Sequence, residues 1–287
     1  MTIGELARRV AVAIVGIPIV GVLVYLGALP LALLLALLGG LGAWELFRMA
    51  RHGGIEPMDV FGVAIAAGLP LYTALWASGA LAAPAALAAV VLVTLLGASL
   101  WARGVEGRPL ASVSVTAFGA VYTGGLLCFA WLLRNHRFAA TAAAGTALVM
   151  YPVVLTWASD IGAYFVGRAL GRAKLMPAIS PGKTRAGAWG ALVVTALASV
   201  AYIRLVLEPQ AQLSLTLGIA IAFGLLVSVV AQVGDLFESM LKREAKVKDS
   251  SHLLPGHGGI LDRLDSLYFV LPVAYLVLEQ ALKPVTR

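Results

Sequence analysis

The chain has 287 residues, of which 61% are hydrophobic and only 12% are charged. Soluble domains carry about 25% charged residues, so this composition excludes an ordinary soluble protein and indicates a membrane protein. The formal charge of +7 comes from cations placed between apolar runs, which favours attraction to anionic lipid headgroups over nucleic-acid binding. The single cysteine, Cys128, excludes a disulfide framework.

Nine apolar segments predict an all-α, polytopic membrane protein, because a membrane-spanning helix needs about 20 predominantly apolar residues. Five of them fall within residues 1–140 and four within 141–287, and we expect the first to be retained as a span. The expected spans cover residues 9–28, 30–47, 60–78, 80–101, 112–133, 145–167, 187–207, 213–234 and 266–282.

The distribution of lysine and arginine predicts the orientation. With a cytoplasmic N-terminus and nine spans, sixteen of the 21 Lys and Arg residues fall on the cytoplasmic side, as the positive-inside rule requires. The C-terminus then lies outside. The two most basic loops, 168–186 and 235–265, face the cytoplasm together and could meet the same substrate.

Asp160 is the first candidate functional residue along the chain. On a helix it shares one stripe with Tyr164, Gly167, Arg168 and Gly171. A carboxylate at membrane depth requires a cation, and small residues let helices approach closely. A functional role and a simple contact between helices both fit this pattern.

The segment Ser180-Pro-Gly-Lys-Thr184 resembles the end of a phosphate-binding P-loop. The motif fails, because Pro177 stands where its first glycine is required and no strand is expected before it. A Pro-Gly turn that presents Lys183, Thr184 and backbone N–H groups still suits phosphate oxygens. An ordinary basic loop is the alternative.

Carboxylates gather around the last two expected spans. Asp235 precedes Ser239 and Lys242 at helical spacings of four and seven, and Asp262 and Asp265 are three residues apart on one helical face. Carboxylates at such spacing suit Mg²⁺, which prefers oxygen ligands. Helix capping, or an ion pair of Asp235 with Lys242 or Arg243, is the alternative.

Other titratable residues carry weaker signals. His257 stands between glycines that allow close approach of a ligand, and a zinc site is not expected because no cluster of His or Cys accompanies it. Glu45 and Glu279 lie near the ends of expected spans, where snorkelling or a helix contact is the default.

Five different polar elements follow one another near the C-terminus: Ser239, Lys242-Arg243, Lys248-Asp249, Pro255-Gly-His257-Gly-Gly259 and Asp262-Arg263-Leu-Asp265. This pattern resembles the signature of the phosphatidate cytidylyltransferases, the CDP-diacylglycerol synthases. Residues 159–164, 167–168 and 180–184 are also similar to family elements. One departure is Arg185-Ala186, where the family usually has Trp-Glu.

The resemblance implies transfer from CTP to phosphatidate, giving CDP-diacylglycerol and pyrophosphate. It implies Mg²⁺ as cofactor, with a second cation in the same site left open, and it makes 141–287 the catalytic region. Expected partners are CTP, phosphatidate and the lipid bilayer, with no nucleic acid and with a homodimer allowed. A bacterial inner membrane with a cytoplasmic active site is the expected location.

Residue roles follow by matching positions to the family pattern. The metal ligands are Asp235, Asp262 and Asp265. The catalytic set is Asp235, Ser239, Lys242, Arg243, Lys248, Asp249, His257, Asp262, Arg263 and Asp265. The substrate-binding set is Asp160, Arg168, Ser180, Lys183, Thr184, Gly258 and Gly259.

Two other functions stay open at this point. A different membrane phosphotransferase, acting on a polyprenyl phosphate, would also use acidic metal ligands and cytoplasmic loops. An anion or lipid transporter would use Asp160 and Asp235 for ion coupling. The close pair Asp262 and Asp265 and the dense lysines favour the cytidylyltransferase.

Overall fold

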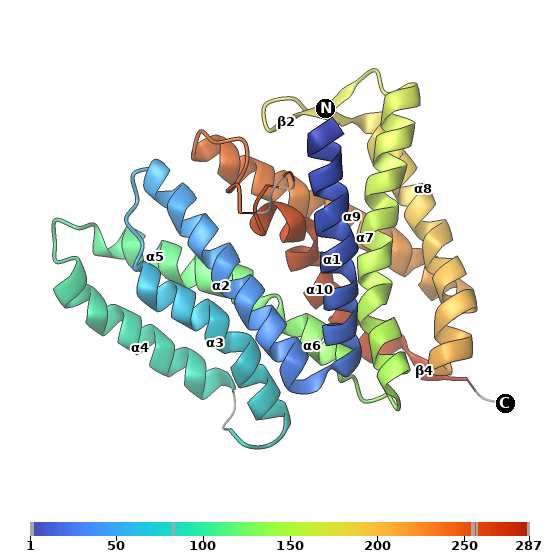
Figure 1. Ribbon diagram of the computed structural model, residues 1–287, viewed down its shortest axis with the longest axis horizontal. Helices are drawn as coiled ribbons and strands as arrows, with labels where there is room; N and C mark the ends of the chain where they lie inside the picture. The colour runs from blue at the N-terminus through green and yellow to red at the C-terminus, as the bar shows by residue number, and fades with distance from the viewer. Residues whose placement is uncertain (1–2, 82–83, 254–255, 257, 286–287) are drawn as a thin grey trace. The chain divides into compact units, whose positions relative to one another are not determined.

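The computed structural model describes residues 3–81, 84–253, 256 and 258–285, and these residues are mostly helical (Figure 1). The chain forms two compact units. Unit 1 comprises Met1–Trp131 and Leu241–Leu264, and unit 2 comprises Leu132–Met240 and Asp265–Arg287. Two helices, α9 (Leu217–Glu244) and α10 (Leu261–Ala281), contribute residues to both units.

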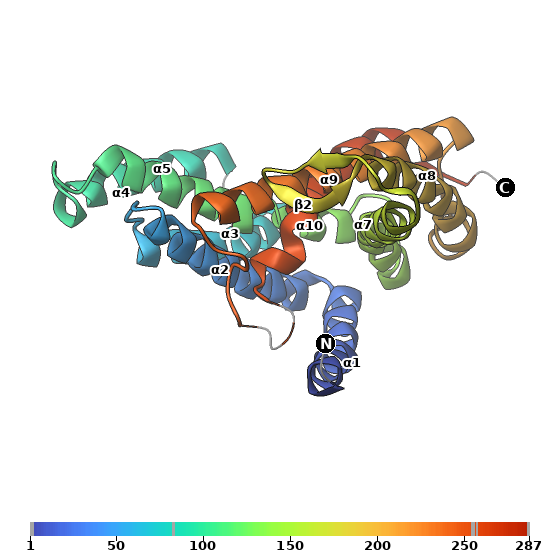
Figure 2. The same cartoon turned by 90° about the horizontal axis from the view of Figure 1, so that it is seen from above.

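Unit 1 is built around α2 (Ala28–His52), which packs against α1, α3, α5 and the π-helical turn η1. Figures 1 and 2 both show α2 and α3 side by side. The other elements are α1 (Ile3–Leu26), α3 (Asp59–Ala77), α4 (Pro84–Ala102), α5 (Pro109–Ala120) and η1 (Val121–Gly125), followed by α6 (Cys128–Arg134) at the boundary. The span expected at 112–133 is therefore a helix interrupted by a π-helical turn.

Unit 2 is built around the packing of α7 (Ala142–Leu170) against α8 (Arg185–Tyr202). A short antiparallel hairpin, β1 (Lys174–Met176) and β2 (Ser180–Thr184), joins the two helices, with Lys174 opposite Thr184. The π-helical segment η2 (Ile203–Ala211) continues α8, and β3 (Leu213–Ser214) pairs with β4 (Lys283–Pro284).

The hairpin corrects one expectation, because a strand does precede Ser180. Two short antiparallel pairs accompany the helices of a fold that is mostly helical, as expected. The loop expected at 168–186 is a helix end followed by this hairpin. The loop expected at 235–265 is shorter, since α9 continues to Glu244 and α10 begins at Leu261.

A helix lies at each of the nine expected ranges, and seven in the described part of the chain are long and apolar enough to cross a membrane. Those seven cover Ala28–His52, Asp59–Ala77, Ala85–Ala102, Pro109–Arg134, Ala142–Leu170, Arg185–Ala211 and Leu217–Glu244. The described apolar part of α1, Ile14–Leu26, is shorter. The helix α10 contains four charged residues, three of them in its first turns.

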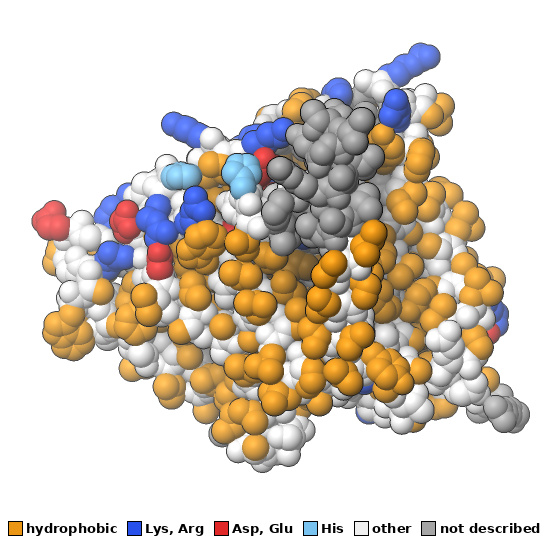
Figure 3. Space-filling view, viewed as in Figure 1, with side chains coloured by type: hydrophobic (Ala, Val, Ile, Leu, Met, Phe, Trp, Pro, Cys, Tyr) orange, Lys and Arg blue, Asp and Glu red, His pale blue; other side chains and the backbone are white. Residues whose placement is uncertain are grey.

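Large hydrophobic side chains remain exposed on these helices, for example Val60 at 82% and Trp101 at 86%. Figure 3 shows hydrophobic side chains over much of the visible face. Contiguous apolar surface of this extent is unfavourable in water and is stable against lipid. Together with the seven apolar helices, it identifies a helical membrane protein.

Candidate active site

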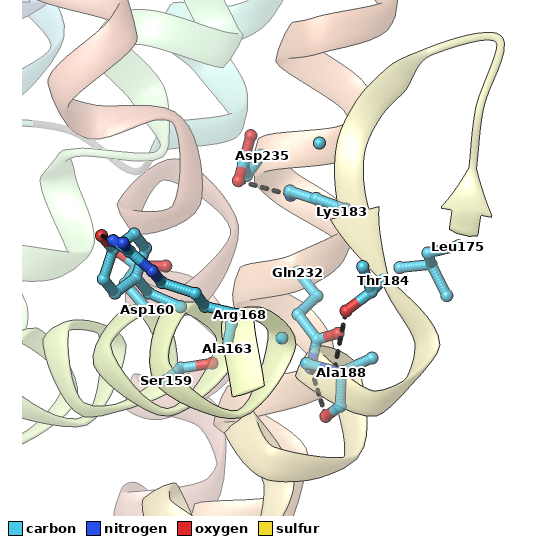
Figure 4. Close-up of a pocket in the computed structure, with 14 residues that line it drawn as sticks. Ser159, Asp160, Ala163, Arg168, Leu175, Lys183, Thr184, Ala188, Gln232 and Asp235 are labelled. Carbon is cyan, nitrogen blue, oxygen red and sulfur yellow. Dashed lines mark hydrogen bonds and ion pairs between the residues drawn. The ribbon is translucent and has the colours of Figure 1, made fainter. Parts of the chain in front are cut away.

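A cavity of about 410 Å³ in unit 2 is lined by residues of five elements, and three of these elements contribute its charged side chains. The helix α7 contributes Asp160, Tyr164 and Arg168; the strand β2 contributes Lys183 and Thr184; the helix α9 contributes Asp235. Figure 4 shows Asp160 and Arg168 on the α7 side of this cavity, with Lys183 and Asp235 directed toward each other. Residues more than 70 positions apart thus line one cavity.

Lys183 and Asp235 form an ion pair between β2 and α9. Their side chains are 26% and 31% exposed, so a ligand in the cavity can reach both. Ser239, one turn along α9, donates from Oγ to Asp235 Oδ1 over 3.4 Å. The sequence left open an ion pair of Asp235 with Lys242 or Arg243; within the described residues its ion-pair partner is Lys183.

The polar stripe expected on α7 lines this cavity through Asp160, Tyr164, Gly167 and Arg168. Arg168 donates from Nη1 to the Tyr164 hydroxyl over 2.8 Å, which orients the guanidinium along the helix. A Cβ atom at Gly167 would lie 3.0 Å from Thr184 Oγ1. The absence of a side chain at that position therefore lets β2 approach α7.

Thr184 also stabilises the start of α8. Its Oγ1 accepts a hydrogen bond from the Gly187 N–H over 3.1 Å, the usual arrangement of an N-cap threonine. The hydroxyl proton remains able to donate to another group. Ser180 opens β2 at the far end of the hairpin and does not line the cavity.

Asp265 is brought close to α9 by a backbone contact. A Cβ atom at Gly234 would lie 2.8 Å from the carbonyl oxygen of Asp265, and Ser266 donates from Oγ to the Ala231 carbonyl over 3.0 Å. The backbones of α9 and α10 therefore touch at the residue before Asp235. This contact places Asp235 and Asp265 on neighbouring turns of two packed helices.

In unit 1, Lys242 Nζ lies 2.7 Å from Asp262 Oδ1. The other carboxylate oxygen of Asp262 accepts from the N–H and Oγ of Ser250, at 3.0 and 2.9 Å, and from the Gly259 N–H at 2.9 Å. Because Asp262 lies in the first turn of α10, its bond to the Gly259 N–H also stabilises the start of that helix.

Lys248 and Asp249 line a separate cavity of about 570 Å³ in unit 1, together with Arg48, His52 and His252. The Arg48 guanidinium lies 4.8 Å from the centre of the Trp44 ring, a cation–π contact. Cations outnumber acids around this cavity, so it suits an anion.

For the remaining predicted residues, the structure gives only the exposure or the backbone conformation. Arg243 and Arg263 are exposed. Gly256 and Gly258 adopt φ values of 77° and 83°, which glycine tolerates without strain. Gly259 is buried, and His257, with the preceding Pro255, lies outside the described residues.

No group of three His, Cys, Asp or Glu side chains in the described part of the chain forms a preassembled metal cluster. Mg²⁺ is usually held by one or two carboxylates together with substrate phosphates and water, so the donors present fit this ion. Asp235 and Asp262 each have a lysine as partner, which shows that both carboxylates already attract a positive group.

The model of the Cytidylyltransferase family matches residues 7–281, nearly the whole chain. The chain belongs to the cytidylyltransferase family. It is therefore a nucleotidyltransferase, as the polar motif predicted.

Two similar proteins match more than nine-tenths of this cytidylyltransferase, and a third matches about half of it. A phosphatidate cytidylyltransferase of Bacillus subtilis is 34% identical over 277 residues, covering 96% of this chain and 98% of that protein. One from Pseudomonas aeruginosa is 39% identical over 277 residues, covering 93% and 95%. One from Staphylococcus haemolyticus is 40% identical over 143 residues, about half of each chain.

Sequence reasoning underestimated Glu45 of this cytidylyltransferase. Snorkelling or a helix contact was the default for it, yet Glu45 is fully buried and accepts four hydrogen bonds from residues 250–261. A signal was available, since Glu45 shares a helical face with Gly42 and Met49, which are small or apolar. An acid on such a face must have donors within the protein.

Proposed function

We propose that this cytidylyltransferase is a phosphatidate cytidylyltransferase, which converts CTP and phosphatidate to CDP-diacylglycerol and pyrophosphate. The full-length relatives that carry this name support the proposal. The observation that carries it is the cavity in unit 2, where Lys183 and Asp235 meet beside Asp160 and Arg168. Cations and carboxylates around one cavity suit a polyphosphate that carries a divalent ion.

In the proposed reaction, an oxygen of the lipid phosphate attacks the α-phosphorus of CTP. The new bond joins that oxygen to the α-phosphorus, the bond to the bridging oxygen of the β-phosphate breaks, and pyrophosphate leaves. A phosphate monoester is largely ionised at neutral pH, so no general base is required. The protein's task is to align two polyanions and to neutralise the charge that develops on the leaving group.

Lysine and arginine side chains serve the first task. We assign phosphate contacts to Lys183 and Arg168 in unit 2 and to Lys242, Arg243, Lys248 and Arg263. Lys183 is 26% exposed and is held by Asp235, so its ammonium is oriented before substrate binds. Ser239 and His257 are assigned polar contacts to ligand or metal, and Asp160, Ser180, Thr184, Gly258 and Gly259 contacts to substrate.

We assign the metal-ligand role to Asp235, Asp262 and Asp265. When bound, Mg²⁺ would neutralise negative charge on the transferred and leaving phosphates. Ser239 donates to Asp235, and Ser250 and Gly259 donate to Asp262, so these two carboxylates are oriented by neighbouring donors. Asp249 is assigned to the same catalytic set through its place beside Lys248.

The proposal includes a topology. Nine spans, a cytoplasmic N-terminus and an outer C-terminus would place the polar segments on the cytoplasmic side of a bacterial inner membrane. Residues 1–140 would anchor the catalytic region 141–287. A reporter fused after Arg287 is expected to be active only outside the cytoplasm; cytoplasmic activity would contradict the nine-span topology. A homodimer, the proposed assembly, would be detected by the mass of the detergent-solubilised protein.

The decisive assay uses purified protein in detergent with phosphatidate, radiolabelled CTP and Mg²⁺. We expect labelled CDP-diacylglycerol and an equal amount of pyrophosphate. UTP in place of CTP, and a polyprenyl phosphate in place of phosphatidate, test the substrate class. Well-folded protein that forms neither product from phosphatidate and CTP would overturn the proposal.

A further inference from the structure

Glu45 is a carboxylate enclosed by donors at the centre of unit 1. It lies in α2, and its exposed fraction is 0%. Its Oε1 accepts from Ser251 Oγ at 2.6 Å and from the Ile260 N–H at 2.9 Å. Its Oε2 accepts from Ser250 Oγ at 2.9 Å and from the Leu261 N–H at 2.8 Å.

These four bonds tie both ends of one segment to a single side chain. Ser250 and Ser251 precede the glycines at 256, 258 and 259, whereas Ile260 directly precedes α10 and Leu261 is its first residue. A carboxylate at the N-terminal end of a helix is favoured by the free N–H groups and the helix dipole. Glu45 therefore holds residues 250–251 and residues 260–261 next to each other.

The same segment contains the partners of Asp262. Ser250 donates from its N–H to Asp262 Oδ2, and its Oγ lies 2.9 Å from both Asp262 Oδ2 and Glu45 Oε2, so its single hydroxyl proton is shared between the two carboxylates. A Cβ atom at Gly259 would lie 2.1 Å from Ser250 Oγ and 2.5 Å from Glu45 Oε2. Only glycine fits there, which shows how closely the loop is packed around Glu45.

We infer that Glu45 is a positioning residue for cytidylyl transfer: through Ser250 and the start of α10, it holds the Asp262 carboxylate in its working orientation. This inference rests on the proposed role of Asp262. Glu45 itself contacts neither substrate nor reacting atoms in this arrangement. Its effect on the reaction is transmitted through hydrogen bonds of the kind that orient metal-binding carboxylates.

Glu45→Gln is the informative substitution, because glutamine has nearly the same shape. Each oxygen of Glu45 faces one backbone N–H, from Ile260 or Leu261. The amide NH₂ of glutamine must take one of these two places in either orientation, and a backbone N–H cannot accept its hydrogen bond. The variant therefore loses at least one backbone bond while the volume is kept.

The first measurement is hydrogen–deuterium exchange of the detergent-solubilised protein. In Glu45→Gln we expect the amides of residues 258–261 to exchange at least about 10-fold faster than in the wild type, with amides of α7 and α8 unchanged. Glu106→Gln, at an exposed position in unit 1, is the matched control and is expected to leave all rates unchanged. Unchanged exchange at 258–261 in Glu45→Gln would overturn the inference.

The second measurement separates positioning from a merely structural role. We expect kcat of Glu45→Gln to fall by about 10-fold or more and the Mg²⁺ concentration for half-maximal rate to rise several-fold. The KM for CTP should change less than about 3-fold. Faster exchange at 258–261 with kcat and Mg²⁺ dependence within 2-fold of wild type would show that Glu45 only stabilises the fold.

Ser251→Ala provides a second variant if Glu45→Gln does not fold. It removes one donor to Oε1 and keeps both backbone bonds, so it is expected to lower kcat by about 2- to 5-fold with the same Mg²⁺ shift. No change in either quantity would overturn the inference. An inactive wild type would instead refute the proposed function. The exchange experiment would still test whether Glu45 protects the amides of residues 258–261.

Discussion

The ammonium of Lys242 lies 2.7 Å from Oδ1 of Asp262, and the two side chains are only 14% and 7% exposed. Lys242 ends a long helix and Asp262 begins the next one, so this pair closes the polar segment between α9 and α10. Mostly buried pairs of this kind require both partners, because removing one leaves an uncompensated charge.

Asp262→Asn is expected to lower kcat by about 100-fold or more, because the amide carries no negative charge and so removes both the proposed metal ligand and the charge that pairs with Lys242. The measurement is the rate of CDP-diacylglycerol formation from labelled CTP. Glu106→Gln serves as the control for expression and extraction. A near-normal rate in folded Asp262→Asn would show that the metal-ligand assignment is wrong.

Lys183→Gln is expected to raise the KM for CTP by about 10-fold or more, since a charged hydrogen bond to phosphate is lost. Asp235→Asn should lower kcat as well, because Asp235 both orients Lys183 and is a proposed metal ligand. The two substitutions share one ion pair, so the double variant should lose less than the sum of the single effects. Additive losses in kcat/KM would indicate that the pair does not act as a unit.

Gly234→Ala is expected to lower the free energy of unfolding by about 1–3 kcal/mol, because the new Cβ would meet the Asp265 carbonyl at 2.8 Å. Activity should fall too, since α9 and α10 must separate beside Asp235. Thermal unfolding in detergent measures the effect. Gly218→Ala in the same helix is the control, because a Cβ there meets nothing within 4 Å; equal losses in both variants would refute the packing argument.

His136 should make stability depend on pH. Burial lowers the pKa of His136 from its usual 6.5, and Arg137 lowers it further, while the Glu279 carboxylate, 2.7 Å from Nε2, opposes the shift. His136 Nδ1 accepts from the Phe138 N–H and the Tyr275 ring packs nearby, so the neutral imidazole fits the folded protein.

Because the folded pKa lies below the unfolded one, the unfolded chain binds more protons below pH 6.5. The contribution of His136 to the free energy of unfolding is therefore expected to be largest above pH 6.5 and to decrease as the pH falls below that value. Thermal unfolding of wild type and His136→Asn between pH 5 and 8 tests this. If stability changed with pH by the same amount in both proteins, the pH dependence would come from groups other than His136.

The sequence by itself determined the class of protein and the chemistry-bearing residues. Long apolar runs require lipid whatever the tertiary arrangement, so a helix at each expected range followed from composition. The spaced motif from Ser239 to Asp265 indicated the family, because five short elements at fixed spacing are a local property of the chain. The helical spacing of Asp160, Tyr164 and Arg168 likewise predicted one shared face.

Only the tertiary structure decided the partners. Lys183 pairs with Asp235 across 52 positions and Glu45 binds Ser250 across 205, and hydrogen bonds between such distant positions leave no periodicity in a single sequence. The hairpin before Lys183 was missed for a related reason, since its strands are short and polar and depend on each other and on the adjoining helices. Local spacing therefore revealed which groups are available, whereas packing determined which of them meet.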